Sequence, residues 1–307
     1  MKLVFTPGMG IGPEVTARAL STLQLDAAVT LFGDGLTIGS ALDAAGVTYT
    51  ESDGPLGDAG VCVVHCQGAE PAPVMAIRCA VEACLAGEAD AMVTGPIHKA
   101  RLIEQGFAFM GHTDMVGSLC QADPVMAFAG GSIRVALVTT HIPLAAVPGA
   151  ITKGRVRRVV EVANASLQGD LGIATPRIAL CGVNPHAGEE GALGRTEVDV
   201  LEPVAEALRR EGISLVGPIS AETAFMDARS GQYDLVIAMY HDQGLVPLKV
   251  LDFGRSVNWT LGVPIVRTSV DHGTADALVG TGRADSASMV AAIQLAIQIV
   301  ERRSGLF

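Results

Sequence analysis

The sequence lacks a long apolar run, and aromatic residues are scarce in it. Aromatics make up 4% of the 307 residues, and the run that comes nearest to a membrane segment, SASMVAAIQLAIQIV, stops at Glu301. A membrane helix needs about 20 apolar residues, so we interpret this run as a helix of the core or of a dimer interface. The opening MKLVFTPG reaches Pro7 and Gly8 too soon to supply the apolar part of a signal peptide. These absences predict a cytoplasmic protein.

Cysteine pairs and positive charge are also missing. None of the six cysteines belongs to a C-x-x-C pair, so we interpret them as reduced thiols of a cytosolic protein. The formal net charge of −11 disfavours nonspecific binding to nucleic acid or to an anionic membrane. An anionic substrate would therefore need a local cluster of basic residues to hold it.

The pattern of apolar segments predicts an α/β protein. Short runs rich in Val, Ile and Leu alternate with helical patterns nearly throughout, and the chain is 49% hydrophobic with 36 glycines. A chain of this length exceeds the size at which a single core usually stops growing. We therefore expect two α/β/α lobes with mostly parallel sheets. Composition marks no linker, so the chain is expected to leave one lobe for the other and return.

Three of the apolar runs end in a histidine. VALVTTHIP reaches His141, IALCGVNPH reaches His186, and LVIAMYHDQG reaches His241. Such runs predict buried parallel strands, and ligands gather at the carboxyl ends of these strands. Three neutral imidazoles at that edge suit a divalent transition metal with a position left open for substrate. A single histidine of this kind is more often an ordinary loop residue, but the repeated pattern favours an exposed site.

Two loops carry weaker signals. GMGIGPE, residues 8–14, follows a predicted strand and precedes a predicted helix, but its spacing matches neither G-x-G-x-x-G nor Walker A. A tight turn without a ligand and a ligand-contacting loop therefore both stay open. GHTD, residues 111–114, offers an imidazole, a hydroxyl and a carboxylate, which suits either a clamp for an oxygen-rich ligand or a capping turn.

The C-terminal third carries the densest set of polar residues. Lys249 and Arg267 supply positive charge among apolar neighbours, and Asn258 supplies an amide donor. Together these three side chains could bind a phosphate, with arginine making paired hydrogen bonds. The segment HGTA, residues 272–275, is followed by two further glycines and predicts a loop that lies along a nucleotide.

Several motifs occur in the order found in the 4-hydroxythreonine-4-phosphate dehydrogenase family of vitamin B6 synthesis. They are GPIHK, GHTD, TTHIPL, GVNPHAGE, MYHDQGLVPLK, VNWTLGVP and RTSVDHGTA, within residues 90–285. The resemblance implies an isopropylmalate-dehydrogenase-like fold with the active site in the cleft between the lobes. It also implies a homodimer that shares this site, and a metal-dependent, NAD(P)-linked oxidation.

The resemblance assigns a role to several groups of residues. The ligands of a divalent metal shared between subunits would be His141, His186 and His241. The phosphorylated substrate would be bound by His112, Thr113, Lys249, Asn258 and Arg267. The cofactor loop would be formed by His272, Gly273, Thr274 and Ala275. The candidates for the proton acceptor are Asp242, His112 and Glu222, and Asp242 has an equally good alternative role in orienting an imidazole.

The expected lobes follow the same resemblance. Residues 1–105 and 255–307 are expected to form a discontinuous first lobe, and residues 106–254 a second lobe with the metal ligands and the dimerisation surface.

The implied reaction converts 4-phosphohydroxy-L-threonine to 3-amino-2-oxopropyl phosphate by oxidation and decarboxylation. It would use NAD or NADP and a divalent ion such as Zn, Mg, Mn or Co. Three alternatives stay open: a dehydrogenase of D-threonate or D-erythronate 4-phosphate, a phosphate acyltransferase, and a non-catalytic sensor of a phosphorylated hydroxy acid.

Some residues depart from the family pattern. The N-terminal glycine loop is two residues shorter than usual, and the segment of residues 30–70 looks trimmed. Asp276 follows HGTA directly, and Ala277 stands where relatives often carry an acid. The metal and phosphate sets are intact, whereas the substrate and the cofactor preference stay open.

Overall fold

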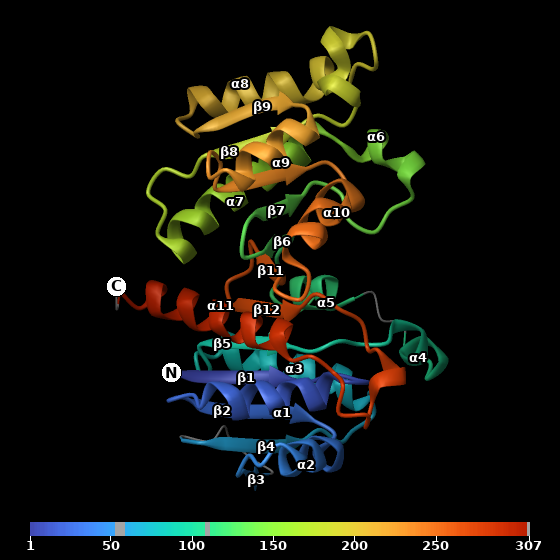
Figure 1. Cartoon of the computed structure of the whole chain (residues 1–307), viewed down its shortest axis with the longest axis vertical. Coiled ribbons are helices and arrows are strands. Elements are labelled where there is room, and N and C mark those ends of the chain that lie inside the picture. Colours follow the sequence, from blue (N-terminus) through green and yellow to red (C-terminus); the bar gives the residue numbers. More distant parts are fainter. Residues whose placement is uncertain (53–58, 108–110, 306–307) are drawn as a thin grey trace. The chain divides into compact units, whose positions relative to one another are not determined.

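The computed structural model describes residues 1–52, 59–107 and 111–305 and forms two compact units. Unit 1 comprises Met1–Pro124 and Val263–Phe307, and unit 2 comprises Val125–Gly262 (Figure 1). The chain thus leaves unit 1 and returns to it. The boundaries fall after residues 124 and 262, whereas the sequence predicted them after 105 and 254. Composition marks neither boundary.

Unit 1 is built on a parallel sheet. Its strands, in spatial order, are β3 (Thr50–Ser52), β4 (Val61–His65), β2 (Ala28–Gly33), β1 (Lys2–Thr6), β5 (Ala91–Thr94) and β12 (Val266–Val270). The short apolar runs LVFT, AVTLFG, VCVVHC and AMVTG form β1, β2, β4 and β5, with ends that agree to within one residue. β2 and β5 are buried along their whole length, as expected of inner parallel strands that are covered on both faces.

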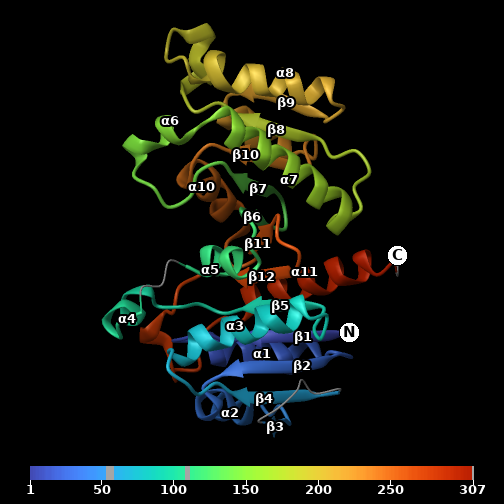
Figure 2. The ribbon, with the colours of Figure 1, turned by 180° about the vertical axis from the view of Figure 1, so that it is seen from behind.

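Helices cover both faces of this sheet. They are α1 (Gly12–Leu23), α2 (Gly35–Ala44), α3 (Ala72–Leu85), α4 (Lys99–Glu104), α5 (His112–Leu119) and α11 (Ala287–Arg303), with a short turn η4 (Asp276–Leu278). In Figure 1, α1 and α11 lie on the near face of the sheet, and Figure 2 shows α3 and α5 on the other face. α11 buries Met289, Ala292, Ile293 and Ala296 against β12, β5 and α1, so the predicted apolar C-terminal helix is a core helix.

Unit 2 has a mixed sheet. Its strands, in spatial order, are β11 (Val257–Leu261), β6 (Val125–Ala129), β7 (Arg134–Leu137), β10 (Leu235–Ala238), β8 (Ile178–Cys181) and β9 (Leu215–Ile219). β6 is antiparallel to both of its neighbours, and the ladder from β7 to β9 is parallel.

The helices of unit 2 lie on both faces of its sheet. They are α6 (Val147–Ala150), α7 (Lys153–Leu171), α8 (Glu202–Arg210), α9 (Ala221–Arg229) and α10 (His241–Asp252), with short turns η1 (Leu144–Ala146), η2 (Pro185–Gly191) and η3 (Glu197–Leu201). Figure 1 shows α9 and α10 on the near face, and α7 and α8 lie on the other face (Figure 2). Phe225 of α9 and Leu248 of α10 pack with Val236 of β10 in one apolar cluster. This packing fixes the start of α10 at the end of β10.

The described part of the chain contains neither a membrane-spanning helix nor a disulfide. No helix within residues 1–52, 59–107 and 111–305 combines the length and the apolar character needed to cross a membrane. All six cysteines lie in these ranges, and none of them forms a disulfide.

Candidate functional site

Three neighbouring parallel strands of unit 2 each lead to one of the three histidines. His141 follows β7, His241 is the first residue of α10 after β10, and His186 lies in the turn η2 after β8. β10 pairs with β7 on one side and with β8 on the other. The sequence therefore predicted correctly that these histidines follow the carboxyl ends of parallel strands, and the structure shows that the three strands are adjacent.

His141 and His241 lie side by side. Their ring centroids are 5.6 Å apart, which is compatible with binding one ion because Zn–N bonds are about 2 Å long. The carboxylate of Asp242 is 2.7 Å from Nδ1 of His241, an arrangement that orients the ring and leaves Nε2 to face a ligand. Within the described residues no group of three His, Cys, Asp or Glu side chains is close enough to hold an ion. His186 thus does not complete a three-ligand cluster within one chain.

Gln243 ties the segments after two of these strands together. Its Oε1 accepts a hydrogen bond of 2.6 Å from the backbone N–H of Met239, and its Nε2 donates one of 2.7 Å to the carbonyl of Gly182. The hydroxyl of Thr139 donates to the carbonyl of Met239 at 2.7 Å. One hydrogen-bonded chain therefore connects residues close to all three histidines.

The turn that carries His186 has an unusual backbone. His186, Ala187, Glu189 and Glu190 have φ values of 53°, 51°, 44° and 54°, and Gly188 between them has φ 80°. The left-handed region costs a non-glycine residue roughly 1 kcal/mol or more. A run of four such residues requires contacts from the surrounding structure that offset this cost.

Glu197 supplies such contacts from the interior of unit 2. Its side chain is fully buried, and Oε1 accepts hydrogen bonds from the backbone N–H groups of Val183 at 2.7 Å and Asn184 at 2.8 Å. Oε2 accepts a bond of 2.9 Å from Nδ2 of Asn184. A Cβ on Gly188 would lie 2.6 Å from this Oε2, so only glycine fits there.

The other candidates of unit 2 lie on different elements. Lys249 is half-buried on α10, Asn258 is half-buried on β11, and Glu222 is exposed in the first turn of α9. Glu222 lies near the end of β8, where its charge helps burial to raise the pKa of Cys181 to about 12.

α10 also presents an apolar face to solvent. Val246, Val250 and Phe253 follow one another at helical spacing and are 58%, 79% and 85% exposed in the single chain. An exposed apolar stripe of this kind is a candidate interaction surface.

Arg267 of unit 1 is buried within β12, where its exposed fraction is 1%. Its Nη2 donates a hydrogen bond of 2.7 Å to the hydroxyl of Thr94 at the end of the adjacent strand β5. Burial lowers the pKa of the Arg267 guanidinium to about 9, so it remains charged at neutral pH.

His112 begins α5 in the same unit, and Thr113 follows it. Burial, with a smaller contribution from the charge of Arg267, lowers the pKa of His112 to about 3. Its imidazole is therefore neutral at physiological pH and able to accept a proton or a hydrogen bond.

The N-terminal glycine loop packs against the predicted cofactor loop. The N–H of Ile11 donates to the carbonyl of Thr274 at 2.9 Å, and the N–H of Met9 donates to the carbonyl of Pro96 at 2.8 Å. Gly10 has φ 62°, and a Cβ there would lie 2.1 Å from the carbonyl oxygen of Thr274. The shortened loop is thus an integral part of unit 1.

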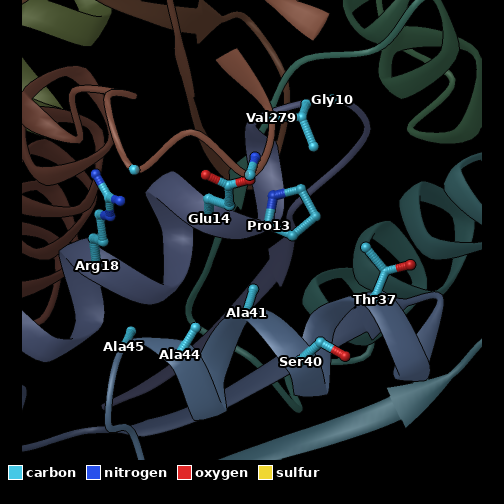
Figure 3. A pocket seen from close by; sticks show the side chains of 12 residues that line it. Gly10, Pro13, Glu14, Arg18, Thr37, Ser40, Ala41, Ala44, Ala45 and Val279 are labelled. Atoms are coloured by element: carbon cyan, nitrogen blue, oxygen red, sulfur yellow. The ribbon is translucent and has the colours of Figure 1, made fainter. Parts of the chain in front are cut away.

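A pocket of about 520 Å³ opens beside these loops. Figure 3 shows Thr37 and Ser40 of α2 on one side and Pro13 and Glu14 of α1 on the other. Glu14 accepts a hydrogen bond of 2.5 Å from the N–H of Gly280. The four residues of the predicted cofactor loop are not part of the lining, which consists of Gly10, Pro13, Glu14, Arg18, Thr37, Ser40, Ala41, Ala44, Ala45, Val279, Gly280 and Gly282.

Glu197 and the hydroxyls of α2 were not predicted from the sequence. A signal for Glu197 was present, because it shares helical spacing with the buried residues Leu201, Val204 and Leu208. An acid on an apolar face needs internal hydrogen-bond donors. Thr37 and Ser40 lie in the segment that was noted only as trimmed, and no local pattern marks them as pocket residues.

Comparisons with known proteins define first the fold and then the family. A crystal structure of isocitrate dehydrogenase from Methylococcus capsulatus matches 99% of this chain and 86% of that chain with a TM-score of 0.56; its 14% sequence identity supports a shared fold alone. The sequence model of the family "Pyridoxal phosphate biosynthetic protein PdxA" matches residues 61–296, and the chain belongs to this family.

Two relatives of known name are similar over nearly the whole chain. A 4-hydroxythreonine-4-phosphate dehydrogenase from Aromatoleum aromaticum is 46% identical over 308 residues, which cover 96% of this chain and 94% of the relative. A crystal structure of the enzyme of the same name from Klebsiella pneumoniae matches with a TM-score of 0.84 and 35% identity, over 97% of this chain and 98% of that chain. The family and the α/β fold predicted from the sequence are confirmed.

Substituting Gly10 should test the packing of the glycine loop. We expect Gly10→Ala to lower the free energy of unfolding by about 2 kcal/mol or more, because its Cβ meets a backbone carbonyl as well as an unfavourable φ. Gly46→Ala is the matched control, since Gly46 has φ 69° and no atom within 4 Å of an added Cβ. Urea unfolding measures the free energy of unfolding of both variants. Equal losses of stability would contradict the role of the close approach of Gly10 to Thr274.

The lowered pKa of His112 predicts a pH dependence of stability. An unfolded histidine titrates near pH 6.5, so between pH 6.5 and about 3 the unfolded chain binds more protons at this position than the folded chain. The free energy of unfolding therefore falls as the pH falls through this window. We expect His112→Asn to remove roughly 1–2 kcal/mol of the loss between pH 6.5 and pH 5. Urea unfolding at pH 6.5 and pH 5 measures the free energy of unfolding of the wild type and of the variant. An equal change with pH in the two proteins would refute the prediction.

Proposed function

We propose that this chain is a metal-dependent, NAD(P)-linked dehydrogenase that oxidises and decarboxylates 4-phosphohydroxy-L-threonine. The secondary alcohol would lose a hydride to the nicotinamide and a proton to a base. The hydride transfer would give the reduced cofactor and a 3-oxo acid. This acid would lose carbon dioxide and take up a proton at the same carbon, which gives 3-amino-2-oxopropyl phosphate. The substrate is suggested by the names of the relatives.

The arrangement of the three histidines is the observation that carries the proposal. His141, His186 and His241 follow three adjacent strands, and the rings of His141 and His241 are 5.6 Å apart. Imidazole ligands suit a first-row divalent ion. Such an ion, when bound, supplies a Lewis acid that stabilises negative charge on a substrate oxygen.

Asp242 is better suited to orient His241 than to act as the base. Its carboxylate is 2.7 Å from Nδ1 of His241, so its nearest partner is already that imidazole. His112 and Glu222 then remain the candidates for the proton acceptor. Burial keeps His112 neutral, but a pKa lowered to about 3 also makes its imidazole a weak base near neutral pH.

The phosphate of the substrate is assigned to Lys249, Asn258 and Arg267, with Thr113 as an added donor. Arg267 is held rigidly by burial and by its bond to Thr94, so it would bind a phosphate at little cost in side-chain entropy.

The cofactor is assigned to the pocket between α1 and α2 and to the loop His272–Ala275 beside it. The pocket has the size of a small-molecule site, and its hydroxyls Thr37 and Ser40 offer partners for ribose oxygens. Gly10 joins the two regions, since it lines the pocket and contacts Thr274. Both NAD and NADP are compatible with this lining.

A homodimer is assigned to the face of α10 formed by Val246, Val250 and Phe253. Its location on the helix that begins with His241 supports a metal site shared by two copies. Because His141 and His241 are neighbours in one chain, the third ligand, His186, would be contributed by the partner.

Chelation and substitution of His186 should separate the proposed reaction from its alternatives. Three substrates are compared: 4-phosphohydroxy-L-threonine, D-threonate 4-phosphate and D-erythronate 4-phosphate. We expect reduced nicotinamide to form with 4-phosphohydroxy-L-threonine. His186→Ala should lower turnover about 100-fold or more without unfolding the protein, because a metal ligand is lost. Chelation should abolish activity and added metal should restore it. Full activity after exhaustive chelation, or turnover without cofactor reduction, would contradict the proposal.

Mixing inactive subunits tests the shared site. Heterodimers of His186→Ala and His241→Ala subunits would keep one intact set of ligands out of two, so we expect about half of the wild-type activity per dimer to return. Heterodimers of His141→Ala and His241→Ala are the control and should stay inactive, since each site would then lack a ligand. Heterodimers of the first pair that form but remain inactive would show that His186 is not supplied by the partner.

A further inference from the structure

We propose that Glu197 is a positioning residue, which holds the left-handed turn Pro185–Gly191 and thereby sets the position of His186. The consequence for metal binding depends on the ligand role of His186 in the function proposed above. Glu197 itself would touch neither metal nor substrate.

The contacts of Glu197 are concentrated at the entrance to this turn. Both of its oxygens accept hydrogen bonds, and the three donors belong to Val183 and Asn184, which directly precede Pro185 and His186. The carboxylate is fully buried, so no water replaces a lost contact cheaply. Two backbone N–H groups and one side-chain amide would lose their acceptor if the carboxylate were removed.

The same carboxylate also defines the interior of the turn. Its Oε2 occupies the space that a Cβ on Gly188 would need, and a Cβ on Gly194 would lie 2.5 Å from Nδ2 of Asn184. The Glu197–Asn184 pair is thus enclosed by the backbone of the loop that follows His186. Movement of this pair would be transmitted to the turn, because the backbone has little room to adjust.

A second glutamate, Glu190 in the left-handed turn, allows the effect of a negative charge to be measured separately from the effect of the hydrogen bonds. Glu190 lies in the same turn and is exposed, and it has no hydrogen bond among those described for unit 2. Removing its charge changes the local electrostatic field without removing a support of the backbone. A role of Glu197 that is only electrostatic would make the two glutamates equivalent.

The proposal is tested with two variants that break the hydrogen bond between Asn184 and Glu197 and with a double variant that restores it in the opposite direction. Glu197→Ala removes the acceptor, and Asn184→Asp places a second carboxylate against the first. In the double variant Asn184→Asp/Glu197→Gln, the amide of residue 197 donates to the carboxylate of residue 184, and the net charge equals that of the wild type. Glu197→Gln is the milder single variant if Glu197→Ala does not fold.

Two measurements are made on each variant, neither of which is an activity. Hydrogen exchange by mass spectrometry on the metal-free protein reports the protection of residues 182–194. Competition with a chromophoric chelator reports the affinity for Zn²⁺ alone. We expect Glu197→Ala and Asn184→Asp to exchange this segment about tenfold faster or more, and to bind Zn²⁺ about tenfold more weakly. The double variant should recover most of both losses, and Glu190→Gln should change neither by more than about twofold.

The outcomes separate this proposal from the function on which its consequence depends. Unchanged exchange in Glu197→Ala, or a double variant no better than the single ones, would overturn the positioning role. Wild-type affinity for Zn²⁺ in a variant with fast exchange would overturn it as well. A wild-type protein that binds no Zn²⁺ would refute the proposed metal site, whereas the exchange of residues 182–194 would still decide whether Glu197 holds the turn.

Discussion

The two hydrogen bonds of the Gln243 side chain are the constraint on which the arrangement in unit 2 depends. One reaches the backbone at the end of β10, and the other reaches the carbonyl of Gly182 after β8. Parallel strands fix where their carboxyl ends lie, but they leave the segments beyond those ends free to diverge. Gln243 removes that freedom, because a single amide group satisfies a donor from one segment and an acceptor from the other. The histidines are thus displayed from a hydrogen-bonded framework rather than from independent loops.

The strained backbone of one turn in this framework is stabilised by a buried side chain. The turn Pro185–Gly191 holds four L-residues at positive φ, and Glu197 provides the buried acceptor next to it. Functional sites often store strain that the surrounding structure offsets. Here the offset comes from a carboxylate that the fold isolates from solvent, so the turn can remain exposed while its base is fixed. The exposed His186 can then be held in place by a buried contact.

Much of the fold followed from the sequence because the relevant signals are local. Short Val- and Ile-rich runs identified the strands, and the histidines that follow them, His141, His186 and His241, were correctly placed after the carboxyl ends of parallel strands. The left-handed turn was not predictable, since positive φ at His186 results from tertiary contacts rather than from residue preference. The unit boundaries at residues 124 and 262 lie between elements without any change in composition. The pocket near Thr37 depends on the approach of α1, α2 and a distant C-terminal loop, which no local pattern records.

The position of β12 has a consequence for how the protein is made. β12 and α11 come from the end of the chain, yet they complete the sheet beside β5. The ribosome finishes Val125–Gly262 before either of them emerges, so unit 2 can fold while β5 still presents a bare edge. An uncovered strand edge is a template for pairing with other chains. Unit 1 can therefore close only after β12 and α11 have been made, although its first segment precedes unit 2 in the chain, and the edge of β5 stays uncovered until then.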